Sequence, residues 1–177
     1  MGRRRIGDAF RHKNISSAVL YAVGALLILL LQNAPSFFPT IVFARPVPLI
    51  VYVACVAVVE GAKAGAIIGV ISGALWGMYA FRVFGFDAML LMIIGLTVGL
   101  LVEWLLRSNF LSALLLSSAA VLSYEIVEWL FSYVIFYKAT AFSVLFRAYL
   151  PTCVYTIVLA PLVYWLVLLL ARLIRRI

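Results

Sequence analysis

Two acidic side chains within an otherwise apolar stretch are the residues best placed to do chemistry. Glu125 and Glu128 stand three residues apart, so they share one face of a helix. At a rise of about 1.5 Å per residue, they lie about 24 to 28 Å above a helix start near Phe110, in the outer third of a bilayer. A carboxylate at that depth must be paired, neutral or in contact with water. Three interpretations stay open. They are contact with a partner protein, proton or solute handling, and a structural pair with a cation (Arg82, Lys138 or Arg147).

The remaining residues give little material for catalysis or cofactor binding. His12 is the only histidine and lies in a basic segment, while Cys55 and Cys153 fall inside apolar runs, where a thiol behaves as a small hydrophobe. The sequence contains neither a phosphate-binding Gly-x-x-x-x-Gly-Lys motif nor a helical metal-binding motif. We therefore expect a protein with no enzymatic activity, no cofactor and no metal.

Two further acids stand next to basic residues in short polar segments. Asp87 follows Arg82, and the simplest interpretation is a local charge pair in an outer turn. Glu60 and Lys63 mark a tight turn between two apolar stretches, and the glutamate suits the N-terminus of the helix that follows.

The composition indicates that these residues are positioned by membrane helices. The chain is 67% hydrophobic and only 11% charged, with a mean hydropathy of +1.21, whereas soluble domains are usually about 25% charged. At about 20 apolar residues per span, 177 residues allow about six spans with little left over for a soluble domain. We predict an all-α integral membrane protein, with a basic tail over residues 1–14 and a single six-helix transmembrane domain over residues 15–177.

The apolar stretches place the six predicted spans. They cover approximately residues 15–31, 47–59, 64–80, 88–106, a stretch that starts at 110, and 151–171. Four of the six prolines fall within residues 33–48, which predicts an interfacial segment rather than one regular helix. The second span is short for a crossing unless it begins within that segment.

The distribution of basic residues predicts the orientation. The net charge is +8, and ten of the fourteen Lys and Arg residues fall in the termini and the even-numbered turns, against four in the odd-numbered turns. Six crossings with this bias place both termini in the cytoplasm.

Glycine recurs at every fourth position in the third predicted span. The stripe consists of five residues (Gly61, Gly65, Gly69, Gly73 and Gly77). In lipid, residues without side chains let two helix backbones approach closely, and spacing by four favours a right-handed crossing. Two alternatives stay open. The stripe is either a tight contact within the chain, for which Gly95 and Gly99 of the next span are suitable partners, or a docking face for another protein.

Two stretches resemble the rod shape-determining protein MreD family. Residues 46–51 lead into residues 60–69, which gives the family's order of a proline, an apolar span, a tight turn and a glycine-rich helix. Residues 150–164 and the basic terminus are similar to the family's end. The family often carries an aspartate where this sequence reads Ala74 to Gly77 and an acid where Val47 stands, so neither acidic position is carried over.

This resemblance implies a non-enzymatic scaffold subunit of the bacterial cell-elongation complex in the cytoplasmic membrane, supporting peptidoglycan synthesis and cell shape. The implied partners are membrane lipids, an MreC-like single-span protein, the RodA polymerase with its penicillin-binding protein, and MreB filaments. The implied fold is similar to the substrate-binding subunits of energy-coupling-factor transporters.

The alternative function is that of a vitamin-binding subunit of such a transporter. It is suggested by six short spans and by a surface of small residues at Ala18 and Ala22. A bound vitamin would need polar groups that converge on it. In the outer half of the membrane domain, the sequence offers chiefly Glu125, Glu128, Arg82 and Arg147 for this purpose.

Overall fold

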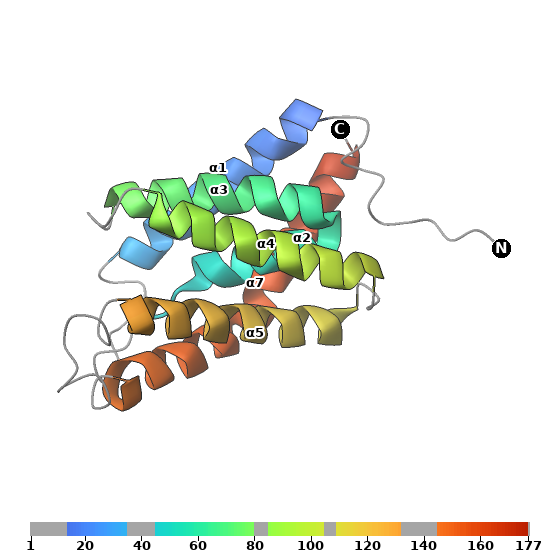
Figure 1. The fold of residues 1–177 in the computed structure, drawn as a ribbon. Coiled ribbons are helices and arrows are strands. Elements are labelled where there is room, and N and C mark those ends of the chain that lie inside the picture. Colours follow the sequence, from blue (N-terminus) through green and yellow to red (C-terminus); the bar gives the residue numbers. More distant parts are fainter. Residues whose placement is uncertain (1–13, 35–44, 80–84, 105–108, 132–144, 177) are drawn as a thin grey trace.

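The computed structural model describes residues 14–34, 45–79, 85–104, 109–131 and 145–176, and the regular elements in them are all helical (Figure 1). The elements are α1 (Asn14–Asn33), α2 (Pro48–Glu60), α3 (Ala62–Tyr79), α4 (Phe86–Trp104), α5 (Phe110–Trp129), the π-helical turn η3 (Leu145–Tyr149) and α7 (Leu150–Arg176). The prediction of an all-α fold is confirmed for these residues.

Helix α2 lies at the centre of the bundle, and the other helices surround it. All thirteen of its residues are buried. It packs against α1, α3, α4, α5 and α7, and the contacts among these five give a ring in the order α1, α3, α4, α5, α7. The sequence explains this position, because residues 48–59 carry no charged side chain and no polar face beyond Tyr52. A helix that is apolar on every side belongs in the interior.

The outside of the ring is apolar as well. Large exposed hydrophobic side chains project from all five ring helices, including Leu30 on α1, Met78 on α3, Met89 on α4, Leu115 on α5 and Val158 on α7. Water would oppose such a surface, whereas lipid tails accept it. The chain is therefore a membrane protein.

Helix length supports three of the predicted spans directly. Among the described residues, Phe86–Trp104, Phe110–Trp129 and Leu145–Ile174 are long and apolar enough to cross a membrane, while Ser17–Asn33, Pro48–Glu60 and Ala62–Met78 are shorter. The 13 residues of α2 rise only about 20 Å, less than the about 30 Å of a hydrocarbon core. Six complete crossings stay a prediction.

The predicted segments between the spans fall mostly outside the described residues. Of the basic tail, only Asn14 is described, and it is the first residue of α1. Of the proposed interfacial segment, residues 45–47 precede α2, which begins at Pro48. The η3 turn directly precedes α7, and Pro151, where the last predicted span begins, occupies the second position of α7.

Candidate functional site

The glycine stripe packs directly on α4. A Cβ atom added to Gly65 would lie 2.6 Å from the carbonyl oxygen of Gly95, and one added to Gly69 or Gly73 would collide with the α4 backbone at Leu91 or Asp87. The relation is reciprocal, since a Cβ at Gly95 would collide with the Gly65 carbonyl group. The two backbones are in contact because the α3 glycines have no side chains to keep α4 away.

Gly99 completes this contact at the other end of the pair, where its Cα faces the backbone of Ala62. The face formed by Gly65, Gly69 and Gly73 is thus occupied by another helix of the same chain. The geometry matches the first of the two alternatives, a tight contact within the chain. A partner protein would have to displace α4 to use these three positions.

Gly61 and Gly77 have different roles from the middle of the stripe. Gly61 has a φ of 94° and forms the turn between α2 and α3, a backbone conformation that side chains rarely adopt. Gly77 is loosely surrounded, because a Cβ there would meet only the Asp87 Oδ2 atom, at 3.7 Å.

Glu103 from α4 caps the start of α3. Its Oε1 atom accepts a hydrogen bond of 2.9 Å from the backbone N–H of Ala62. A Cβ at Gly61 would lie 2.6 Å from the same oxygen, so the glycine also makes room for this carboxylate. The expectation that Glu60 serves the N-terminus of α3 stays a prediction. Glu60 is the last residue of α2, is buried, and accepts a 2.8 Å hydrogen bond from the Tyr21 hydroxyl group.

A second tyrosine joins α1 to α2. The Tyr52 hydroxyl group donates to the backbone carbonyl oxygen of Tyr21 at 2.8 Å. This hydroxyl group lies against Gly24, where a Cβ would approach it to 2.5 Å. Tyr21 therefore connects the two helices both through its own hydroxyl group and through its carbonyl group.

The N-terminal end of α2 obtains hydrogen-bond acceptors from two other helices. The N–H of Val47 donates to Thr156 Oγ1 at 3.0 Å, and the N–H of Leu49 donates to Gln32 Oε1 at 3.4 Å. Free N–H groups at a helix start would be costly in a dry interior. These side chains of α7 and α1 satisfy them.

Asp87 lies inside the bundle rather than at the surface of an outer turn. It is fully buried in the first turn of α4, and its Oδ1 atom accepts a 2.8 Å hydrogen bond from the Tyr124 hydroxyl group of α5. The Oδ2 atom has no hydrogen-bond partner in the described part of the chain. The Tyr124 ring also contacts Trp76, with the ring centroids 6.2 Å apart. Arg82 lies outside the described residues, so its pairing with Asp87 stays a prediction.

Glu125 and Glu128 share α5 but differ in burial. Glu125 is 5% exposed, whereas Glu128 is half-buried, and neither side chain is free of interactions. Of the cations considered as their partners, only Arg147 is described, as an exposed residue of η3. The three interpretations of this pair stay open.

Sequence reasoning missed the buried tyrosines whose hydroxyl groups join helices. Tyr21, Tyr52 and Tyr124 are wholly buried. Each lies in a largely apolar stretch of sequence, where a tyrosine cannot be told from one more hydrophobic residue. A buried tyrosine hydroxyl group normally has a hydrogen-bond partner. This general rule is the only indication of these hydrogen bonds that the sequence offers. Among the described residues, no group of three or more histidine, cysteine, aspartate or glutamate side chains could hold a metal ion. The hydroxyl groups of Tyr21, Tyr52 and Tyr124 join helices together.

In a comparison with protein-family models, residues 13–174 match the rod shape-determining protein MreD family. Neither the curated proteins nor the solved structures gave a match to this chain.

Proposed function

The chain belongs to the rod shape-determining protein MreD family, and from that premise we propose that it is a scaffold subunit of the bacterial cell-elongation complex. It is a non-enzymatic membrane protein with a role in determining rod shape. The proposal adds that it supports peptidoglycan synthesis by holding other membrane proteins together. The family match over nearly the whole chain is the observation that carries this proposal.

The use of the polar residues supports a scaffold. Glu60, Asp87 and Glu103 accept hydrogen bonds from neighbouring helices, so their role in the described structure is to fix helix positions. The middle of the glycine stripe is occupied by α4. Partner helices would then bind to the outward faces of the ring, by packing in lipid.

The proposed partners are an MreC-like single-span protein, the RodA polymerase with its penicillin-binding protein, and MreB filaments. Purification of the tagged chain in a mild detergent from cells that express all of these proteins tests this set. We expect the single-span protein to co-purify in a fixed ratio. Native mass spectrometry of the same preparation would instead detect a bound vitamin if the chain were a transporter subunit, and that result would contradict the scaffold.

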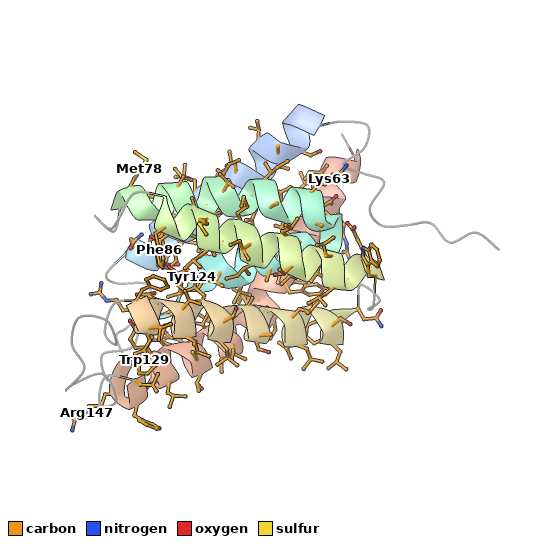
Figure 2. All side chains as sticks on the ribbon, in the orientation of Figure 1. Lys63, Met78, Phe86, Tyr124, Trp129 and Arg147 are labelled. Atoms are coloured by element: carbon orange, nitrogen blue, oxygen red, sulfur yellow. The ribbon has the colours of Figure 1, made fainter. Side chains whose placement is uncertain are left out.

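The proposed topology is six crossings of the cytoplasmic membrane with both termini in the cytoplasm. The start of α1 and the end of α7 lie at the same end of the bundle (Figure 1), and Lys63 lies near that end (Figure 2), which supports an even number of crossings and a basic cytoplasmic side. Alkaline phosphatase is active only outside the cytoplasm. We therefore expect no activity from fusions after residue 177 and full activity from fusions within residues 80–84.

Replacement of the resident MreD gene in a rod-shaped bacterium by a gene for this chain tests the function. We expect cells without either gene to become round and cells that express this chain to remain rods. A Gly69→Leu/Gly73→Leu variant should fail because α4 cannot pack, while the lipid-facing Val158→Leu variant should restore the rod shape. Round cells despite normal membrane levels of the native chain would refute a general shape-determining role in that host.

A further inference from the structure

The fold distributes the charges of the chain unequally between the two ends of the bundle. α1, α3 and α5 begin at one end, and α2, α4 and α7 end there (Figure 1). With each segment between helices assigned to the helix ends that it joins, this end has ten basic and three acidic residues, a net charge of +7. The other end has four basic and three acidic residues, a net charge of +1. We call the first the basic end, and its basic residues are Arg3, Arg4, Arg5, Arg11, Lys13, Lys63, Arg107, Arg172, Arg175 and Arg176.

The acidic side chains of the basic end do little to neutralise its surface. Glu60 is buried and accepts a hydrogen bond from a tyrosine of α1. Glu103 accepts a hydrogen bond from the backbone at the start of α3. Lys63 on α3 and Arg172 near the end of α7 are both exposed. Burial therefore withdraws negative charge from this surface and leaves the positive charge of these two residues on it.

The two exposed cations stand at the edge of the lipid-facing surface. Ile67, one turn after Lys63, is an exposed apolar residue, and so is Leu173, which follows Arg172. From such an edge, the long side chains of lysine and arginine place their charges at the level of the lipid headgroups. Anionic headgroups attract basic residues at this level. The phosphate groups of phospholipids are therefore within reach of the basic end.

We propose that the basic end binds the headgroups of anionic phospholipids, so that the lipid beside it is richer in them than the rest of the membrane. Lys63 and Arg172 contact phosphate groups at the rim of the bundle, and the other basic residues strengthen the attraction. The occupant follows from charge and place, because a net charge of +7 at the edge of an apolar surface is complementary to an anion anchored in the same bilayer. This inference goes beyond the scaffold role and depends only on the membrane location of the chain.

Trp104 is a natural reporter for the lipid at the basic end. Its side chain is 81% exposed, and it follows Glu103, whose carboxylate binds the start of α3. Changing the other three tryptophans (Trp76, Trp129 and Trp165) to phenylalanine leaves it as the only tryptophan. Phospholipids with brominated acyl chains quench the fluorescence of a tryptophan that they contact. Nanodiscs of phosphatidylglycerol and phosphatidylcholine in equal amounts, with one or the other brominated, then report which lipid lies beside Trp104.

The anionic lipid should be the better quencher. We expect brominated phosphatidylglycerol to quench Trp104 at least about twice as strongly as brominated phosphatidylcholine. The excess should shrink in about 0.5 M salt, where the screening length falls to about 4 Å. A chain that keeps Trp129 as its only tryptophan reports on the other end (Figure 2) and should show a smaller excess.

Substitutions assign the effect to the exposed cations. Lys63→Gln/Arg172→Gln should remove about half of the excess or more, whereas Lys63→Arg/Arg172→Lys keeps both charges and should retain it. The matched control is Arg45→Gln/Arg147→Gln, which removes two exposed cations from the other end and should leave the Trp104 excess unchanged.

Three results would overturn the lipid site. One is equal quenching of Trp104 by the two brominated lipids, which would leave the basic residues to orient the chain or to bind an acidic protein segment. Another is an undiminished excess in Lys63→Gln/Arg172→Gln. The third is an equal loss in Arg45→Gln/Arg147→Gln, because the effect would then follow the total charge of the chain and not its position.

Discussion

Alanine should lower the stability of the protein at one glycine of α3, Gly69, and not at another, Gly77. At Gly69 the added Cβ would collide with the carbonyl group of Leu91 and lie 3.0 Å from the Cα of Met92. These are backbone atoms, which cannot rotate away, so α4 must shift as a whole. At Gly77 the added Cβ would meet only Asp87 Oδ2, at 3.7 Å, which is an ordinary contact.

The magnitude follows from two opposing terms. Replacing an interior glycine by alanine favours the helix by up to about 1 kcal/mol, and this term is common to both positions. Overpacking of a tight contact costs about 1 to 3 kcal/mol, and it applies only at Gly69. The free energy of unfolding should therefore fall by up to about 3 kcal/mol in Gly69→Ala and stay equal or rise by up to about 1 kcal/mol in Gly77→Ala.

Reversible unfolding of the purified chain in mixed micelles with increasing SDS measures both values, with the helical circular dichroism signal as the readout. The Gly77→Ala variant is the matched control, since it makes the same chemical change on the same helix. Equal effects at the two positions, or a more stable Gly69→Ala protein, would refute the backbone contact between α3 and α4.

The hydrogen bonds between helices give three further predictions for the same assay. Glu103→Ala removes the acceptor for the Ala62 N–H and should cost about 0.5 to 2 kcal/mol, whereas Glu103→Gln should retain most of the stability. Tyr21→Phe removes the donor to the Glu60 carboxylate and should cost about 1.5 to 3 kcal/mol; no loss would mean that this bond contributes nothing. Thr156→Val leaves the N–H that precedes α2 without its acceptor and should cost about 1 to 3 kcal/mol, while Thr156→Ser should stay close to the native protein.

The helices and the glycine contact follow from local sequence patterns. Apolar runs between polar segments place the helices, and glycines at every fourth position mark a face that some backbone must approach. Gly95 and Gly99 could be named as partners because consecutive membrane helices joined by a short turn lie side by side. The observed contact of Gly65 with Gly95 has this origin.

The positions of the acids could not be read from the same patterns. Asp87 stands near Arg82 in the sequence, which favours a surface pair, yet its side chain is fully buried against Tyr124, 37 residues away. Glu60 stands just before α3 in the sequence, but the residue whose side chain caps the first residue of α3, Ala62, is Glu103, which comes 41 residues later. Such partners depend on how the helices pack around α2. A single sequence contains no local signal for that arrangement.

The central position of α2 connects the inner contacts to the function of the outer surface. Because every residue of α2 is buried, each of the other five helices is positioned by packing against the same 13 residues. A change in one contact with α2 therefore alters the angle of a helix whose opposite side faces lipid. In a scaffold, those opposite sides are the surfaces that bind partners. Substitutions inside the ring, such as those at Tyr21 or Thr156, should thus weaken partner binding only to the extent that they move a ring helix.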